Sequence, residues 1–260
     1  MEFTLPDGSL YYERAGAGAP VVLLHGFSFD RRMWAAPARA LAAAGFQAIA
    51  YDLRGFGRST LPAGPYAHVE DLRALLDHLG LEAAHLVGLS LGGGQAIEFA
   101  LKYPERTRSL TAVDSTLGGY PWTKDWGEPG RLARSVGLAA AKAAWLADPV
   151  IAPALERPDV DGLVRQMVAD YSGWHWLNRD PETGGRGPVP AYAPLGEIRA
   201  PAVIVVGETD VPDFHGVADH LARRLPRARR VELAGAGHLS SLEAPERFNA
   251  VLLDFLLQSA

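Results

Sequence analysis

The chain has 260 residues, of which 48% are hydrophobic, and a formal net charge of −5. It contains no cysteine, which excludes disulfides, thiolate metal sites and a cysteine nucleophile. The charge favours neither nucleic acid nor an anionic membrane as a partner, and no apolar segment reaches the roughly 20 residues that span a bilayer. The start, Met1–Thr4, lacks the features of a secretory signal. We therefore expect a soluble, cytoplasmic protein.

Short apolar runs, bounded by turn residues, predict strands that are buried on both faces of a parallel sheet. Two alternating segments before them, Phe3–Leu5 and Leu10–Glu13, predict an N-terminal hairpin. The buried runs, in chain order, are Val21–Leu24, Ala48–Tyr51, His85–Gly88, Leu110–Val113 and Ala202–Gly207, with a strand-like Arg230–Leu233 after them.

Segments with helical spacing of apolar residues lie between these runs. One spans residues 69–79, a second follows residue 90, and the last is Pro245–Leu257. Strands that alternate with helices predict an α/β fold with a mostly parallel central sheet and helices on both faces. A group of basic residues near the end is interpreted as a solvated face; it comprises Arg223, Arg224, Arg227, Arg229 and Arg230.

From about residue 117 to residue 195 the alternation stops. No run typical of a buried strand occurs there, and five of the six tryptophans fall within it. Turn-rich stretches flank apolar helical material. We interpret 117–195 as a helical insertion on a core formed by 1–116 and 196–260.

The strongest motif is Gly88-Leu89-Ser90-Leu91-Gly92, which follows a predicted strand and opens a predicted helix. In such an elbow the central residue has a strained backbone, and the residues two positions away must be small. Ser90 is therefore the candidate nucleophile. A phosphate-binding loop does not fit, since no Lys-Ser or Lys-Thr pair follows the glycines.

A serine nucleophile needs a base, and the chain offers eight histidines. His68, His78 and His220 fall in predicted surface helices, whereas His238 stands in a glycine-rich turn after a strand and before the last helix. We choose His238 as the base.

The acid that orients the base is expected after another parallel strand. Asp210 follows Ala202–Gly207 and is our choice, with Asp213, Glu208 and Asp114 as alternatives. Ser90, Asp210 and His238 then occur in the order that the nucleophile-elbow fold uses.

Two backbone N–H groups are needed to stabilise an oxyanion. Leu91, directly after the nucleophile, is expected to supply one, and Phe27, in the loop after Val21–Leu24, the other. His25 in that loop is interpreted as structural.

These motifs together resemble the α/β-hydrolase superfamily. They include His25-Gly26, Asp52–Ser59, Gly88–Gly93, Gly207–Asp210 and Gly237-His238, in the order and spacing of its landmarks. Asp52–Ser59 is interpreted as structural. Within the superfamily the chain is most similar to the enol-lactonase and cofactor-free haloperoxidase-type esterase branch. That resemblance implies that 117–195 is a helical cap.

The expected activity is hydrolysis of a small carboxylic ester or lactone through an acyl-enzyme on Ser90. No metal or organic cofactor is expected, and a metal group of Asp210, Asp213 and His215 has no familiar ligand pattern. Trp34, Trp174 and Trp176 are predicted to border an apolar substrate pocket.

Three alternatives to an esterase or lactonase stay open. They are C–C bond hydrolysis, perhydrolase or haloperoxidase-like activity, and ligand binding without catalysis. The residue before Ser90 is Leu89, whereas many meta-cleavage C–C hydrolases have Asn there. The oligomeric state is not predicted.

Overall fold

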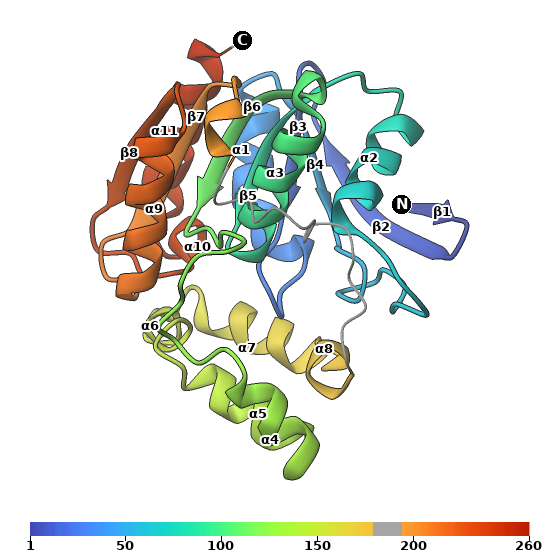
Figure 1. Ribbon diagram of the computed structural model, residues 1–260, viewed down its shortest axis with the longest axis vertical. Helices are drawn as coiled ribbons and strands as arrows, with labels where there is room; N and C mark the ends of the chain where they lie inside the picture. Colours follow the sequence, from blue (N-terminus) through green and yellow to red (C-terminus); the bar gives the residue numbers. More distant parts are fainter. Residues whose placement is uncertain (179–193, 260) are drawn as a thin grey trace.

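The computed structural model describes residues 1–178 and 194–259 and has an eight-stranded sheet at its centre (Figure 1). The strands lie in the order β1-β2-β4-β3-β5-β6-β7-β8. Their bounds are β1 Glu2–Leu5, β2 Gly8–Ala15, β3 Pro20–Leu24, β4 Gln47–Tyr51, β5 Ala84–Leu89, β6 Thr107–Val113, β7 Ala202–Gly207 and β8 Ala228–Leu233.

Pairing between neighbouring strands is parallel from β4 through β8, and antiparallel only where β1, β2 and β4 meet. Every residue of β3, β5 and β7 is buried. Such burial suits strands with helices on both faces, which explains their continuous apolar sequences. The predicted mostly parallel sheet and the N-terminal hairpin are confirmed.

The helices of the core cover this sheet. Helix α1 packs against α11, and α2 packs against α3. The bounds are α1 Ala35–Ala43, α2 His68–His78, α3 Leu91–Lys102, α9 Pro212–Arg224, α10 Ser240–Glu243 and α11 Pro245–Gln258, with short 3-10 turns η1 Arg31–Trp34, η2 Pro104–Arg106 and η3 Leu195–Glu197.

Five helices between β6 and β7 lie together below the sheet in Figure 1, at the lower end of the molecule. They are α4 Glu128–Ser135, α5 Leu138–Leu146, α6 Ala152–Leu155, α7 Asp161–Asp170 and α8 Trp174–Leu177. They contact one another, α4 with α5 and α8, and α7 with α5 and α6. No strand occurs between β6 and β7 in the residues that the structure describes.

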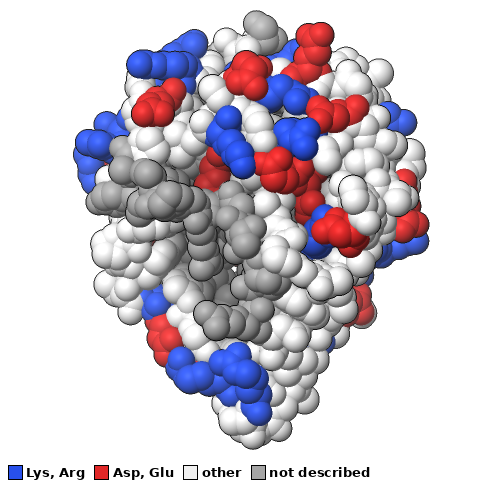
Figure 2. All heavy atoms as spheres, turned by 45° about the vertical axis from the view of Figure 1, so that its right-hand side comes forward, with Lys and Arg blue, Asp and Glu red and all other residues white. Residues whose placement is uncertain are grey.

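The surface in Figure 2 carries interspersed acidic and basic side chains over its upper part, while its lower end is mainly uncharged apart from a basic group with an acidic group beside it. Within the arginine group near the C-terminus, Arg229 pairs with Asp254 at 2.8 Å and Arg230 with Asp219 at 3.0 Å. These pairs agree with a solvated face. In the described parts of the chain, no helix has the length and apolarity needed to cross a membrane.

One histidine differs from its predicted position. His68, expected on a helix surface, is 2% exposed. Its ring packs against Tyr66 with centroids 5.0 Å apart. The prediction was wrong because His68 is the first residue of α2, where the loop that precedes the helix covers it.

Candidate active site

The turn between β5 and α3 holds Ser90 in a conformation that non-glycine residues rarely adopt. Its φ and ψ angles are 53° and −113°, and contacts between Cβ and the backbone disfavour a positive φ. A Cβ atom on Gly88 would collide with the carbonyl group of Gly92, and one on Gly92 with the carbonyl of Leu24. The turn therefore requires both glycines and presents Ser90 at the N-terminus of α3.

His238 and Asp210 form a buried pair. Nδ1 of His238 donates a hydrogen bond to Oδ2 of Asp210 at 2.8 Å, and the two side chains are 4% and 0% exposed. Oδ1 of Asp210 accepts the N–H of Val211 at 2.7 Å. Because β7 and β8 are parallel neighbours, the residues that follow them meet at one edge of the sheet. With the proton on Nδ1, the other imidazole nitrogen has a free lone pair that can accept a proton.

Sequence analysis missed Glu243, which holds the loop that carries His238. Its buried carboxylate accepts the N–H of Gly237 at 2.8 Å and the N–H of Leu239 at 2.9 Å. The ring of Phe214 lies 4.2 Å from the imidazole, centroid to centroid. The Glu243 carboxylate thus fixes the backbone before and after His238, and Phe214 restricts the orientation of the imidazole ring.

The nearby alternatives to Asp210 have other partners. Asp213 accepts the N–H of Lys124 at 2.9 Å and so anchors the segment after β6. Glu208 accepts the N–H of Gly235 at 2.7 Å. Asp210 is the one of these three acids that hydrogen-bonds the imidazole.

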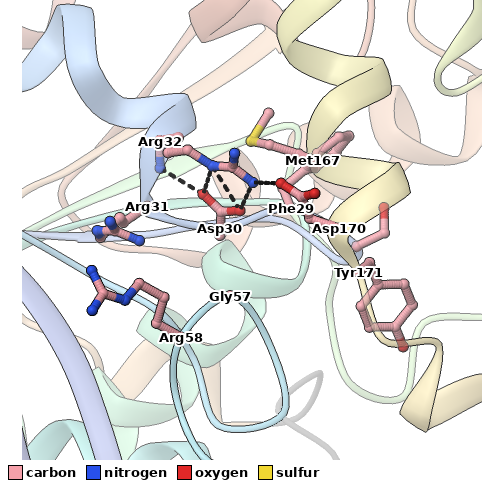
Figure 3. Close-up of a pocket in the computed structure, with 10 residues that line it drawn as sticks. Phe29, Asp30, Arg31, Arg32, Gly57, Arg58, Met167, Asp170 and Tyr171 are labelled. Atoms are coloured by element: carbon pink, nitrogen blue, oxygen red, sulfur yellow. Dashed lines mark hydrogen bonds and ion pairs between the residues drawn. The ribbon is translucent and has the colours of Figure 1, made fainter.

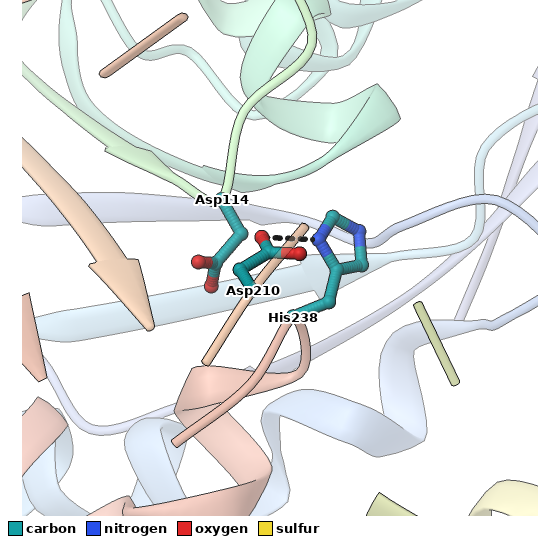
Figure 4. A group of neighbouring side chains, drawn as sticks. All are labelled: Asp114, Asp210 and His238. Carbon is teal, nitrogen blue, oxygen red and sulfur yellow. Dashed lines mark hydrogen bonds and ion pairs between the residues drawn. The ribbon is translucent and has the colours of Figure 1, made fainter. Parts of the chain in front are cut away.

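The fourth acid, Asp114, lies beside this pair (Figure 4). It directly follows β6 with a φ of 42° and is fully buried. Oδ1 accepts the N–H of Gly207 at 2.7 Å, and Oδ2 accepts the hydroxyl of Ser240 at 2.5 Å. Burial, followed by the charge of Asp210, raises the pKa of Asp114 well above its ordinary value. Two neighbouring buried carboxylates resist being ionised together.

The same acidic cluster has the residue types of a metal site. Asp114, Asp210 and His238 offer ligand atoms that lie within 4.8 Å of one another. However, both oxygens of Asp114 already accept protein hydrogen bonds, and Nδ1 of His238 already donates one. These contacts favour a hydrogen-bonded cluster over cation ligation. Among the described residues, Asp213 and His215 do not join Asp210 in a metal-ligating group.

The predicted oxyanion residues border Ser90. Phe27 and Leu91 line the same cavity as Ser90 and His238. Leu91 is the first residue of α3, so its N–H has no acceptor within the helix. The loop that carries Phe27 approaches the elbow closely, because a Cβ on Gly26 would lie 3.6 Å from Cβ of Ser90.

His25 joins two loops. Its Nδ1 donates to the carbonyl of Gly26 at 2.8 Å, and its Nε2 accepts the N–H of Leu53 at 2.9 Å. Burial lowers the pKa of His25. Asp52 likewise accepts the N–H of Arg58 at 2.9 Å within the Asp52–Ser59 loop. These contacts support the structural roles inferred from the sequence.

The cavity that Ser90 and His238 share has a volume of about 740 Å³. It lies between the sheet edge and the helices that follow β6. Its aromatic lining comes from both parts, namely Phe27, Phe29, Trp122, Trp126, Trp145 and Trp176, with His175 beside them. Such a wall suits an apolar or aromatic group of a ligand.

Among the residues that the structure describes, Trp176 lines this cavity, and the other two predicted pocket tryptophans, Trp34 and Trp174, do not. Trp34 is fully buried in η1, where its ring packs against Phe248 of α11 at 6.0 Å. Trp174 lies half-buried on α8 with its ring 5.1 Å from that of His175. Trp34 and Trp174 are thus corrected to packing positions, because composition alone does not show which face of an element a ring occupies.

A second cavity of about 330 Å³ lies outside the Ser90 pocket (Figure 3). Arg32 in its wall donates to Asp30 at 2.6 Å and to Asp170 at 2.7 Å. Asp170 ends α7, so this network connects η1 of the core with the helices after β6. Arg32 is thus paired with both carboxylates, and neither Ser90 nor His238 lines this cavity.

Comparisons with known proteins agree with this architecture. Residues 19–245 match the model of the alpha/beta hydrolase fold family. The chain belongs to this family. A 2-hydroxy-6-oxononadienedioate/2-hydroxy-6-oxononatrienedioate hydrolase of Paraburkholderia phymatum is 31% identical, and the match covers 96% of this chain and 91% of that protein.

Two solved α/β hydrolases have similar structures. The enol-lactonase from Burkholderia xenovorans superposes with a TM-score of 0.85 at 26% identity, covering 99% of this chain and 100% of that one. A thermophilic esterase from Thermogutta terrifontis has a TM-score of 0.83 at 28% identity, with 97% and 94% covered. Membership in the family identifies this chain as a hydrolase of that fold, as the sequence resemblance implied, and its relatives act on small molecules.

Proposed function

We propose that this α/β hydrolase cleaves a small carboxylic ester or lactone through an acyl-enzyme on Ser90. The observation that carries the proposal is the 2.8 Å hydrogen bond from His238 to a buried Asp210, since His238 lines the same cavity as Ser90. A strained serine, an imidazole and an orienting carboxylate are the components of nucleophilic acyl transfer.

In the proposed reaction His238 removes the Ser90 proton, and Ser90 attacks the substrate carbonyl. Asp210 holds the imidazole in one tautomer and stabilises its positive charge. The N–H groups of Phe27 and Leu91 bind the oxyanion, and each is expected to contribute about 3–4 kcal/mol to the transition state. His238 then protonates the leaving alcohol and activates a water that releases the acid.

The segment 117–195 is proposed to act as a cap over this reaction. Its described helices supply Trp126, Trp145 and Trp176 to the cavity wall. An apolar wall excludes water and favours an acyl or alcohol group that is itself apolar or aromatic. A cavity of about 740 Å³ accommodates a substrate of modest size.

A second candidate is C–C bond hydrolysis, which the 31% identical Paraburkholderia phymatum hydrolase favours by its name. The same Ser90 and His238 would serve both reactions. The two are separated by comparing turnover of a vinylogous 1,5-diketone with that of p-nitrophenyl esters. A kcat/KM at least 100-fold higher for the diketone would overturn the ester proposal.

The proposal is tested with p-nitrophenyl acetate, butyrate and octanoate, using wild type and Ser90→Ala in the presence of EDTA. We expect wild-type turnover that survives EDTA and falls by about 10⁴–10⁶ in the variant. Equal rates in the two proteins would exclude Ser90 as nucleophile. Adding peroxide in acetate buffer tests perhydrolysis with the same preparation.

A further inference from the structure

Ser28 lies one residue after Phe27 and has a backbone conformation that its side chain disfavours. Its φ is 65°, in the left-handed region where Cβ contacts the backbone closely. In the described chain only Ser28, Ser90 and Asp114 combine a positive φ with a side chain. Ser28 is also 1% exposed, so solvent does not stabilise its hydroxyl. Some contact must hold the residue in this conformation.

That contact comes from the helices after β6. Nε1 of Trp145, on α5, donates a hydrogen bond to Oγ of Ser28 at 2.7 Å. The two residues are 117 positions apart in the chain, and the bond is buried. Trp145 is itself 6% exposed. A buried donor and acceptor that lost each other would both be left without a partner, which makes the bond costly to break.

The same indole also contacts the neighbouring residue. The ring of Trp145 lies 6.0 Å from that of Phe27 in an edge-to-face arrangement, and 6.2 Å from that of Trp176. Trp145 lines the cavity of Ser90, whereas Ser28 lines the second cavity behind it. The hydrogen bond therefore crosses the wall between the two cavities and fastens the loop after β3.

We propose that Trp145 is a positioning residue that holds the oxyanion loop through Ser28, so that the helices after β6 complete the catalytic geometry as well as covering the cavity. This inference rests on the proposed function. Rotation of Ser28 toward a more favourable φ would turn the preceding peptide and displace Phe27. The hydrogen bond from the Phe27 N–H to the oxyanion would then be longer and weaker, while the aromatic wall that binds substrate would stay in place.

The test uses Trp145→Phe, which keeps an aromatic ring and removes the donor, and Ser28→Ala, which removes the acceptor. Since displacing one oxyanion donor is costly, we expect kcat to fall about 10- to 100-fold in each variant, with KM within about twofold of wild type. The double variant should be no worse than either single variant, because both remove one bond.

A second readout separates positioning from packing. A trifluoromethyl ketone adds to Ser90 and places an oxyanion in the site, whereas the matching methyl ketone binds without it. We expect the affinity for the fluorinated ketone to fall 10- to 100-fold in Trp145→Phe and the affinity for the methyl ketone to change less than twofold. Trp126→Phe, a matched change in the same wall, should alter both affinities in parallel.

Wild-type kcat in Trp145→Phe, or equal losses for the two ketones, would overturn the proposal. The backbone amide ¹H and ¹⁵N resonances of Phe27 in the free protein provide a readout that does not depend on esterase activity. We expect them to move alike in Trp145→Phe and Ser28→Ala. If the wild type hydrolysed no ester but these resonances moved, the proposed function would fail, whereas positioning of the Phe27 loop by the Trp145–Ser28 hydrogen bond would be supported. Unchanged resonances would show that the Trp145–Ser28 hydrogen bond does not position this loop.

Discussion

Oδ2 of Asp210 lies 2.8 Å from Nδ1 of His238, although the two residues are 28 positions apart. Each follows one of two parallel neighbouring strands, and the carboxylate has no exposed surface. The hydrogen bond sets which imidazole nitrogen carries the proton, and so leaves Nε2 as the nitrogen that is proposed to act as the base.

Asp210→Asn is expected to lower kcat by about 10⁴, because the amide donates where the carboxylate accepts and reverses the imidazole tautomer. Ester hydrolysis under saturating substrate measures the loss. Asp213→Asn is the matched control, since Asp213 bonds the backbone of Lys124 and not His238. A larger loss in Asp213→Asn than in Asp210→Asn would identify the wrong acid.

Gly92→Ala is expected to destabilise the fold and abolish activity. The added Cβ would collide with the backbone of Leu24 and approach the carbonyl of His25 to 2.7 Å, and overpacking typically costs about 1–3 kcal/mol or more. Gly162→Ala, on α7 with nothing within 4 Å of the new atom, should instead stabilise by up to about 1 kcal/mol. Urea unfolding compares the two, and a Gly92→Ala protein as stable as wild type would contradict the packing described for the elbow.

Asp114→Asn tests the buried acid cluster through the pH dependence of stability. Because the folded pKa of Asp114 is raised by burial and by Asp210, the unfolded chain releases its proton first as pH rises. The contribution of Asp114 to wild-type stability is therefore fully present below the unfolded pKa and is lost as pH rises toward the folded pKa. The slope is at most about 1.4 kcal/mol per pH unit for one proton. The free energy of unfolding of Asp114→Asn, relative to wild type, should rise from pH 4 to pH 8; a constant difference would show that Asp114 ionises normally.

His68→Leu tests stability in the opposite direction of pH. Burial, and next the charge of His175, lower the pKa of His68 well below its ordinary value of 6.5. Its contribution to stability is present above pH 6.5 and is lost as pH falls, since only the unfolded chain takes up the proton readily. Between pH 7 and pH 5 the variant should lose less stability than wild type, by up to about 1.4 kcal/mol per pH unit. Parallel losses in the two proteins would mean that His68 has the same pKa in the folded and the unfolded chain.

The elements that could be predicted from the sequence are those with local patterns. The buried strands appear as apolar runs, and the elbow appears as Gly88–Gly92 because its steric requirement acts over five residues. The chain order of strands then places Asp210 and His238 at one sheet edge. Choosing Asp210 over Asp213 depended on position after β7, and the structure shows the two carboxylates bonding in different directions.

Contacts between distant segments were beyond the sequence. The hydrogen bond from Trp145 to Ser28 joins residues that are 117 positions apart, and the sequence around either residue does not indicate the other. Tryptophan composition pointed to an aromatic wall and to Trp176 in it, but not to the other members, because Trp34 packs on α11 whereas Trp126 lines the cavity. The sequence of α2 likewise does not show the burial of His68, whose ring packs on Tyr66 in the loop before the helix.

The most direct test of an acyl-enzyme on Ser90 is covalent labelling of the active protein with a fluorophosphonate, followed by peptide mass spectrometry. We predict one phosphonyl group per chain, on the peptide that contains Ser90, with activity falling in proportion to labelling. His238→Ala should label far more slowly, because Ser90 has lost its base. Full labelling with activity retained, or a modification that maps to another residue while activity is lost, would contradict Ser90 as the nucleophile.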